Sequence, residues 1–351
     1  MSEIDISGAV CPLPLPHQDQ IMMGHGSGGK MGADLIAKTF LAAFDNEALR
    51  AGDDGAVVAI SEGRIAISTD SHVVSPLFFA GGDIGHLSVC GTVNDVAMMG
   101  AKPLYMSVGF ILEEGLSLTT LQRVVASMKA AAEEAGVQIV CGDTKVVERG
   151  KADGIYINTT GVGFISPGIT IGGAQAKPGD MVILSGTIGD HGIAVLAARG
   201  ELGFETDVRS DSAPLNHLIE AMLGTSDNIH VLRDPTRGGV ATTLNEIAHQ
   251  SDVCILLDET SIPVRSSVAA VCEMLGFDPL YVANEGKLLA IVSPEDVEKV
   301  LAVMRRTKYG EDSVVIGVVQ QAPKKRVLLK TAIGSTRIVD VLMGEMLPRI
   351  C

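Results

Sequence analysis

The sequence predicts an α+β protein of two domains, and three observations lead to this class. The chain has 351 residues, enough for two domains of ordinary size, and 46% of them are hydrophobic. Strand and helix patterns mix without the regular cadence of a doubly wound sheet, so antiparallel sheets fit better. A Gly/Pro-rich joint lies at 167–179. We therefore expect domains at 46–166 and 167–333, a Gly-rich leader at 1–45 and a mobile tail at 334–351.

The first domain is predicted to combine strands with two helices. Alternating apolar residues indicate strands at 56–60 and 64–68, separated by a Glu62-Gly63 turn. The clearest helix is 118–135, where apolar residues recur at helical spacing. Ser117 or Thr119 can cap its start, and Gly136 can end it. The other elements expected here are a small-residue helix at 84–99 and strands at 104–112, 137–141 and 155–165.

The second domain is predicted to alternate short apolar strands with amphipathic helices. Aromatic residues make up only 3% of the chain, so both cores must consist of aliphatic side chains, Ala and Met. The strands are expected at 181–185, 253–257, 288–291, 314–320 and 326–330. The helices are expected at 192–199, 213–223, 239–250, 266–275 and 294–308.

The charge and the cysteine pattern exclude several classes of protein. A net charge of -15 disfavours nucleic acids and anionic membranes, which are bound through basic patches. No segment approaches the roughly 18 apolar residues of a membrane span, and the N-terminus lacks a signal-peptide pattern. The six cysteines include no CxxC pair, so neither a zinc ribbon nor an iron–sulfur site is indicated. We expect a cytoplasmic protein with free thiols, no nucleic-acid partner and no membrane partner.

The last residue, Cys351, is a thiol at a chain end. Chain ends are usually mobile, and a mobile thiol suits a group that is carried between active sites. A prenylation signal is excluded, because that motif places Cys four residues from the end. An incidental terminal Cys is the simpler interpretation of this residue alone.

A Gly-rich stretch at 24–30 almost matches a P-loop. Met31 stands where the motif needs Ser or Thr for Mg²⁺, and no convincing strand precedes the stretch, so a P-loop is excluded. Gly28, Gly29 and Lys30 can instead form a lid whose amides and ammonium face phosphates. A merely flexible leader fits this loop equally well.

Acidic residues recur in the first domain, where they are expected at strand ends or turns. They are Asp53, Asp54, Asp70, Asn94 with Asp95, and Asp143. One Asp beside Gly is more often a turn residue or a helix cap. Several in one domain favour hard oxygen ligands that hold Mg²⁺ together with phosphates. Lys145 adds a cation near Asp143, although a surface lysine is an equal interpretation.

Two motifs of the second domain carry possible chemistry. Asp234 opens a DPTRGG stretch before a helix, which suits anion binding or an ordinary turn and cap. Glu285, in a stretch NEGK, can act as a general base or lie in a solvated turn. His25, His72 and His191 neighbour these loops, but their spacing is not that of a metal site, and we expect structural roles.

Taken together, these motifs resemble the aminoimidazole-ribonucleotide-synthetase superfamily over nearly the whole chain. Its members include selenophosphate synthetase, thiamine-monophosphate kinase and the HypE family of hydrogenase maturation proteins. The terminal Pro-Arg-Ile-Cys, 348–351, is similar to the HypE tail, whereas the Gly-rich leader carries no reactive Cys of the selenophosphate synthetase type. The motifs that carry the resemblance are the leader, GDD at 52–54, STD at 68–70, GTVNDVAMMGAKP at 91–103, CGDTK at 141–145 and DPTRGG at 234–239.

This resemblance implies two α/β domains, with the N-terminal domains pairing into a dimeric β-barrel and ATP bound between the domains. It also implies that a HypF-type carbamoyltransferase loads the Cys351 thiolate. ATP then activates the carboxamide, and loss of phosphate leaves a thiocyanate. A HypC–HypD-type partner takes the cyanide to the iron of [NiFe]-hydrogenase.

The resemblance also suggests roles for individual residues. Cys351 is the carrier, Lys145 neutralises phosphoryl charge and Glu285 removes the N–H proton. Mg²⁺ ligands are expected among Asp53, Asp70, Asp95 and Asp143. How the residues divide among metal, ribose and phosphate is left open. The residues expected to bind the nucleotide are Gly28, Gly29, Lys30, Asp53, Asp54, Asp70, Asn94, Asp95, Asp143 and Asp234.

Two other functions remain open at this point. One is a superfamily enzyme that phosphorylates a diffusible small substrate, with an incidental tail. The other is a non-catalytic scaffold that assembles maturation partners.

Overall fold

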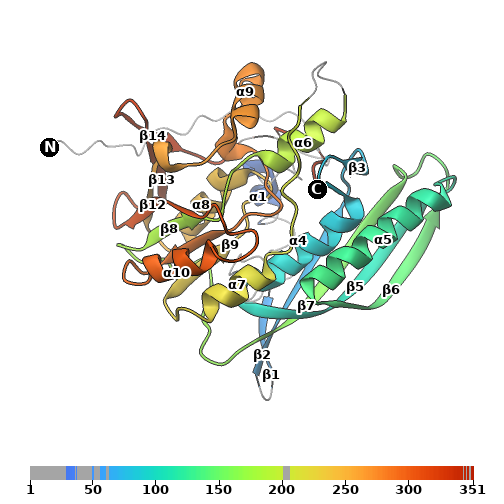
Figure 1. Ribbon diagram of the computed structural model, residues 1–351, viewed down its shortest axis with the longest axis horizontal. Coiled ribbons are helices and arrows are strands. Elements are labelled where there is room, and N and C mark those ends of the chain that lie inside the picture. The colour runs from blue at the N-terminus through green and yellow to red at the C-terminus, as the bar shows by residue number, and fades with distance from the viewer. Residues whose placement is uncertain are drawn as a thin grey trace.

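A computed structural model of the chain describes residues 29–35, 37, 50, 56–60, 63–200, 206–342, 344, 346–347 and 349–351. Two sheets with their covering helices form two domains that lie side by side (Figure 1). Both sheets are largely antiparallel, with one parallel pair in each, which agrees with the predicted α+β class. Of the predicted site residues, Gly28, Asp53 and Asp54 lie outside the described part of the chain.

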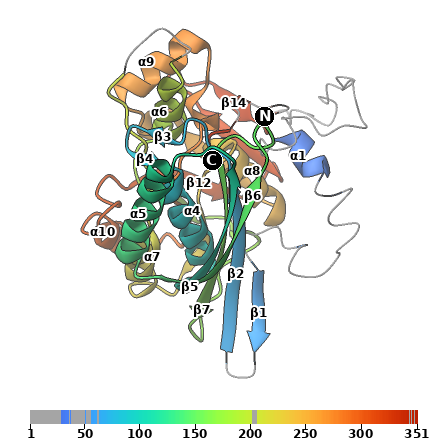
Figure 2. The ribbon, with the colours of Figure 1, turned by 90° about the vertical axis from the view of Figure 1, so that its right-hand side faces the viewer.

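The first sheet has the strand order β1-β2-β7-β5-β6, and only β5 and β6 run parallel. Helices α4 and α5 cover one of its faces, while β1 and β2 extend beyond them (Figure 2). Burial alternates along β7, where Ile157 faces the helices at 1% exposure and Phe164 is 36% exposed on the opposite face. The bounds are β1 (Ala56–Ile60), β2 (Gly63–His72), β5 (Ala101–Glu113), β6 (Gln138–Val147), β7 (Ile155–Ile165), α4 (Ile84–Met98) and α5 (Leu118–Ala135).

Helices α4 and α5 form for different reasons. The predicted bounds of α5 are confirmed: the Ser117 hydroxyl accepts from the Thr120 N–H at 3.2 Å, and Gly136 ends the helix at φ +70°. Helix α4 is buried almost all round, because it packs on α5 and the sheet and also touches α7 and β9 of the second domain. It is therefore the central element of the domain junction.

The second sheet has the order β14-β13-β10-β12-β8-β11-β9. Both faces are covered, since Val182 and Leu184 of β8 join the core under α8, while Ile183 joins the core under α7 and α10. The strands are β8 (Met181–Leu184), β9 (Ile229–Arg233), β10 (Cys254–Asp258), β11 (Leu289–Val292), β12 (Val314–Gln320), β13 (Arg326–Lys330) and β14 (Thr336–Val339). The helices are α6 (Asp190–Ala198), α7 (Asn216–Leu223), α8 (Gly239–Gln250), α9 (Ser266–Leu275) and α10 (Val297–Met304).

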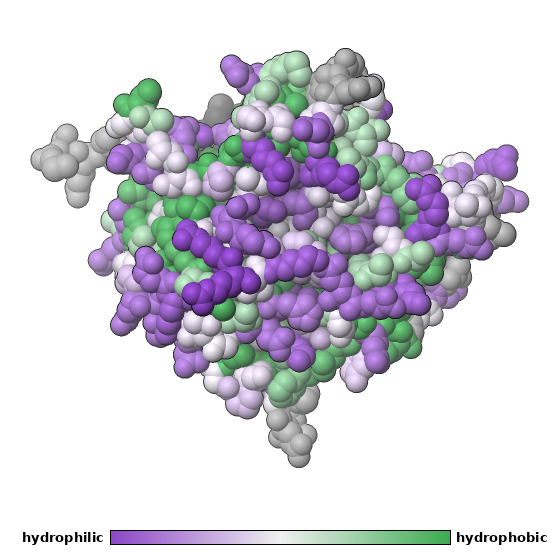
Figure 3. Space-filling view, in the orientation of Figure 1, coloured by the Kyte–Doolittle hydropathy of each residue, from purple (hydrophilic) through white to green (hydrophobic). Residues whose placement is uncertain are grey.

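Several short elements complete the described structure. They are α1 (Lys30–Leu35), β3 (Phe78–Phe79), β4 (Gly82–Asp83), η3 (Glu259–Ser261) and η4 (Pro279–Tyr281). The surface in the view of Figure 3 is mixed, with hydrophilic residues interspersed among apolar ones. None of the helices in the described ranges is long and apolar enough to cross a membrane.

Some sequence expectations require correction. Strand β2 continues to His72 and β6 to Val147, so Asp70 and Asp143 lie within strands and not in turns. Asn94 and Asp95 lie inside α4. Strands β9 and β14 were not predicted, because both are short and carry basic residues among few apolar ones. The segment predicted as a mobile tail from 334 begins with β14, which pairs with β13.

Candidate functional site

The C-terminal residues pair with the segment that follows β2. The Val73 N–H donates to the Cys351 carbonyl at 3.1 Å, and the Ser75 N–H donates to the Arg349 carbonyl at 3.2 Å. This register is antiparallel, so the chain end lies like a short strand beside 73–75. Figure 1 marks this end between β3 and α6. Cys351 is thereby placed next to a residue only three positions from Asp70.

Side chains hold this end as well. Leu347 and Ile350 are 8% and 6% exposed and belong to the same core as Ile193 of α6. His191 Nε2 lies 2.6 Å from the Ile350 carbonyl, which can only accept. Arg199 Nη2 donates to the Arg349 carbonyl at 2.9 Å. Cys351 itself is half-buried.

The predicted acidic residues of β2 and α4 face one another. Ser68, Asp70 and His72 lie on the side of β2 that faces α4, because they alternate with residues of the other face. The Ser68 hydroxyl donates to Asp95 Oδ2 at 2.7 Å. His72 Nε2 is 3.6 Å from Asp70 Oδ2, and burial lowers the His72 pKa. The first domain thus presents Asp70 and Asp95 together.

Glu285 and Asp234 come from two loops that Asn284 ties together. Asn284 Nδ2 donates to the Pro235 carbonyl at 2.9 Å, and its Oδ1 accepts from the Gly189 N–H at 2.8 Å. Burial raises the pKa of Asp234 to about 6, against the pull of Arg233. Burial raises the Glu285 pKa well above its ordinary value, and the charges of Asp234 and Asp70 raise it further. Glu285 is 4% exposed.

Arg237 is a site residue that was not predicted by itself, only as part of the DPTRGG motif at 234–239. Its side chain is solvent-accessible although protein atoms surround it closely. Cys351 raises the Arg237 pKa most, and Asp70, Glu285 and Asp95 raise it further. This cation therefore lies within electrostatic range of acidic groups from both domains and from the chain end. An Arg directly before the two glycines that open a helix is the signal that could have identified it.

Asn94 serves the domain junction. Its amide nitrogen donates to the Ala213 carbonyl at 3.0 Å, and its oxygen accepts from the Leu215 N–H at 2.8 Å. It is 1% exposed, so we expect it to support the site and not to touch a nucleotide.

Asp143 and Lys145 lie apart from the Asp70–Asp95 pair. Asp143 of β6 is in register with Gly109 of β5, and Gly109 is in register with Asn158 of β7. Asn158 is in turn in register with Ser71 of β2. Residues in register across a sheet share a face, and Ser71 points away from the face of its neighbour Asp70. Lys145 Nζ pairs with Asp143 Oδ2 at 3.0 Å, and both side chains are about 70% exposed. The described part of the chain therefore does not bring Asp143 to the Asp70–Asp95 pair.

Lys30 lies near the base of the tail. Its N–H donates to the Leu342 carbonyl at 2.9 Å, and a Cβ on Gly29 would lie 2.4 Å from the same oxygen. The end of the leader thus contacts the chain beyond β14. Within the described residues, no three His, Cys, Asp or Glu side chains gather as a metal site.

Fold and site together define the class. The sequence matches the AIR synthase related protein family, with its N-terminal domain over residues 52–165 and its C-terminal domain over 177–330. The carbamoyl dehydratase HypE of Cupriavidus necator is 57% identical over 333 residues, 95% of this chain and of that protein. The HypE of Escherichia coli is 45% identical over 95% of this chain and all of that protein.

Solved structures agree with these relatives. A HypE–HypF complex superposes with a TM-score of 0.84 at 51% identity, covering 88% of this chain and 99% of that one. A HypE in complex with ATP gives 0.80 at 52% identity, covering 93% and 98%. The chain therefore belongs to the AIR synthase related protein family and, within it, to the carbamoyl dehydratase family HypE. The expectations of this family and of an enzyme of the dehydratase type are confirmed.

Proposed function

We propose that the protein converts an S-carbamoyl group on Cys351 to a thiocyanate at the expense of ATP, to supply the cyanide ligand of a [NiFe]-hydrogenase iron. The observation that carries this proposal is the half-buried terminal Cys351, paired with the backbone at 73 and acting on Arg237 together with Asp70 and Glu285. A carrier thiol needs such a seat beside acid–base groups.

The proposed dehydration has two chemical steps. The carboxamide oxygen attacks the γ-phosphorus, and the bond to the bridging oxygen breaks to release ADP. A base takes one N–H proton as the imidate forms. Removal of the second N–H proton and departure of phosphate then form the C≡N bond. One thiocarbamate and one ATP thus give one thiocyanate, ADP and phosphate.

Glu285 is our choice for the base. A carboxylate with a raised pKa is a stronger proton acceptor once it is ionised, and its burial keeps water away from the activated imidate. Arg237 is accessible and lies near Cys351, so it is suited to neutralise phosphoryl charge, the role that we also assign to Lys145.

The donor set fits Mg²⁺ bound with a nucleotide. Mg²⁺ in such sites needs only one or two protein carboxylates besides the phosphates, and Asp70 and Asp95 supply two hard oxygen donors on facing elements. These two would hold the ion, with Asp53 and, from a second copy of the chain, Asp143 as further ligands. The ion supplies neutralising charge on the phosphates. Gly28, Gly29, Lys30, Asp54 and Asp234 remain proposed for the nucleotide itself.

A homodimer is proposed from the open face of the first sheet. Tyr105, Ile111 and Phe164 are 48%, 43% and 36% exposed there, on the side that no described helix covers. Apolar sheet faces of this kind are normally buried, and a second copy would bury this one as a β-barrel. It would also bring the exposed Asp143 and Lys145 to a neighbouring site.

The partners are proposed from the relatives. A related HypE forms a complex with HypF, which suits a carbamoyltransferase that loads Cys351. A HypC–HypD-type complex would receive the cyanide group.

Intact-protein mass spectrometry tests the proposal. After incubation with carbamoyl donor, HypF-type transferase and Mg·ATP, the wild-type chain should gain a carbamoyl group and then lose the mass of water. Cys351→Ala should show neither change, while Cys272→Ala, which removes a buried thiol, should behave as wild type. A carbamoylated Cys351→Ala chain, or ATP turnover of a small substrate without Cys351, would contradict the proposal.

A further inference from the structure

Two side chains from the region of α6 contact the main chain of the docked chain end. Arg199 joins the tail to the body, since its Nη2 donates to the Arg349 carbonyl at 2.9 Å and its Nε to the Ser75 carbonyl at 3.0 Å. His191 Nε2 contacts the Ile350 carbonyl at 2.6 Å. Both residues belong to the region of α6, one near its start and one just after its end.

The His191 ring is fixed for this contact. Its Nδ1 lies 2.8 Å from the Ser210 hydroxyl, and the Phe79 ring lies perpendicular to it with 5.5 Å between the ring centroids. Because the Ile350 carbonyl only accepts, Nε2 carries the proton and Nδ1 accepts from Ser210. The ring is 0% exposed with the tail in place, and a departing tail would take away the acceptor of its Nε2–H. Docking of the tail and the hydrogen bond of His191 Nε2 are therefore linked.

The contacts are made to main-chain carbonyls of the terminal tripeptide. Main-chain contacts position the peptide without reading its side chains, whereas Leu347 and Ile350 supply the apolar anchors. Cys351 adds a main-chain bond of its own to Val73 but keeps a half-buried side chain. We call the contacts of His191, Arg199 and Val73 with the terminal tripeptide the seat. The seat fixes the position of the Cys351 thiol.

We infer that His191 and Arg199 are positioning residues that hold the terminal tripeptide in the dehydration site and set the fraction of chains whose tail is docked. This inference rests on the proposed function and adds to it that tail docking selects which reaction Cys351 can undergo. A released tail exposes Cys351 to a carbamoyl donor, and a docked tail presents the thiocarbamate to the ATP site. Weakening the seat should therefore accelerate the chemistry of the free thiol and, once docking is rare, slow nitrile formation.

Alkylation of Cys351 in the full chain tests the seat. His191→Phe keeps a flat ring without a donor, and Arg199→Lys replaces the fork of Nε and Nη2 by a single ammonium group. Loss of one such bond should raise the alkylation rate of Cys351 about five- to tenfold. His191→Gln, which can still donate to Ile350, should stay near the wild-type rate. The double variant, His191→Phe with Arg199→Lys, should also slow single-turnover nitrile formation from carbamoylated protein. Its affinity for ATP should be unchanged.

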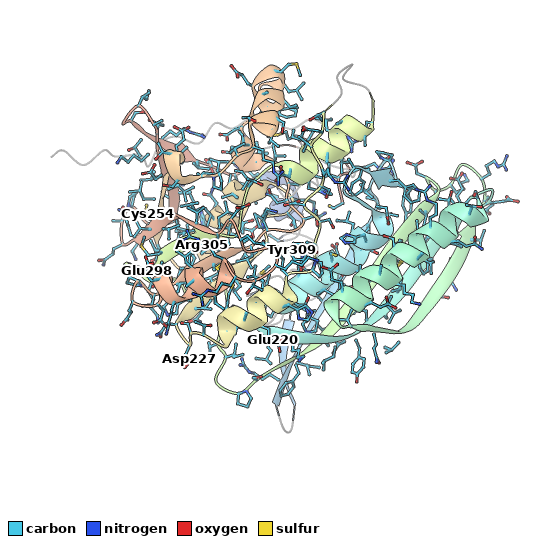
Figure 4. All side chains as sticks on the ribbon, in the orientation of Figure 1. Glu220, Asp227, Cys254, Glu298, Arg305 and Tyr309 are labelled. Carbon is cyan, nitrogen blue, oxygen red and sulfur yellow. The ribbon has the colours of Figure 1, made fainter. Side chains whose placement is uncertain are left out.

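Arg305→Lys is the matched control. Arg305 Nε likewise donates to a main-chain carbonyl, that of Ser313, at 2.9 Å, and it lies on the α10 side of the second domain (Figure 4). An unchanged alkylation rate of Cys351 in both His191→Phe and Arg199→Lys would overturn the inference. So would a rise in Arg305→Lys and His191→Gln as large as the rise in those two variants. If His191→Phe fails to fold, Arg199→Lys carries the test. Alkylation needs neither ATP nor transferase, so its outcome is independent of the Cys351→Ala result.

Discussion

At the scale of single residues, two buried carboxyl groups have a raised pKa. Glu285 and Asp234 lie in adjoining loops, and burial raises the pKa of both. Asp211, whose Oδ1 accepts from the Glu285 N–H at 3.1 Å, is partly balanced by Lys287 at 3.2 Å. Two neighbouring buried acids with raised pKa, Glu285 and Asp234, are suited to proton transfer.

The first prediction concerns Glu285→Gln. The amide keeps the shape of the side chain but cannot accept the N–H proton, so nitrile formation should slow by about 10²–10⁴-fold. Carbamoylation of Cys351 should continue at the wild-type rate, because it occurs on the partner enzyme. Quenched-flow mass spectrometry of carbamoylated protein measures both steps. Glu298→Gln on α10 is the control (Figure 4), and a wild-type nitrile rate in Glu285→Gln would exclude Glu285 as the base.

The second prediction concerns Asp234 and pH. Its folded-state pKa of about 6 exceeds the ordinary 3.8, so the folded state binds this proton more tightly. The contribution of Asp234 to the free energy of unfolding therefore falls as pH rises from about 4 through 6. Asp234→Asn removes this penalty, and its advantage over wild type should grow by roughly 1–3 kcal/mol between pH 4 and pH 8.

Urea unfolding at several pH values measures this difference. Asp227→Asn, in the loop before β9, is the control, and it should leave the slope of stability against pH unchanged. Parallel stability curves for wild type and Asp234→Asn would show that Asp234 has no raised pKa in the folded protein.

At the scale of elements, β2 organises the site. One of its faces carries Ser68, Asp70 and His72 toward α4, and its continuation at 73–75 receives the chain end. A single extended segment therefore aligns the predicted metal ligands with the proposed carrier thiol. Helix α4 supplies Asp95 opposite Ser68, and the absence of a side chain at Gly91 lets the Asp70–His72 pair approach the helix.

The third prediction is that Asp95→Ala weakens Mg·ATP binding. It removes a hard oxygen donor from the Asp70–Asp95 pair, so the affinity should fall by about 1–3 kcal/mol. Ala favours the helix, so α4 itself should persist. Calorimetric titration with and without Mg²⁺ measures the effect, with Asp227→Ala as the control. Equal loss with and without Mg²⁺ would mean that Asp95 does not act through the metal.

At the scale of the whole molecule, the two domains are joined firmly along α5 and α7. Glu134 of α5 accepts from Lys308 at 2.6 Å and from the Tyr309 hydroxyl, which lies near α7 in Figure 4. Asn216 donates to the Ala135 carbonyl at 2.8 Å. The open face of the first sheet lies outside this junction, so a second copy can use it without separating the domains.

The fourth prediction is complementation between subunits. If Lys145 serves the site of the neighbouring protomer, a mixed dimer of Lys145→Ala and Glu285→Gln chains contains one intact site. Half of the dimers in an equal mixture are mixed, so about a quarter of the wild-type rate should return. Nitrile formation after subunit exchange measures this. No recovery in a mixture that demonstrably exchanges would place Lys145 and Glu285 in the same chain's site or outside catalysis.

The sequence by itself determined most of the elements and the family. Periodic segments such as α5 are specified locally, by apolar spacing with Ser117 before it and Gly136 after it. The motifs and the terminal Cys351 pointed to the ATP-dependent chemistry through their resemblance to a family. The true lengths of β2 and β6 were missed, because their second halves are polar and pair with neighbours far away in the chain.

Only the tertiary structure decided which of the motif residues meet. Side chains alternate along a strand, so the register of β2, β7, β5 and β6 sends Asp70 to the face with α4 and Asp143 to the open one. The same structure brought Arg237 near Cys351 and the tail against His191 and Arg199. Motif spacing contains no such information, since these contacts span from about 110 to 160 residues and depend on how two domains pack.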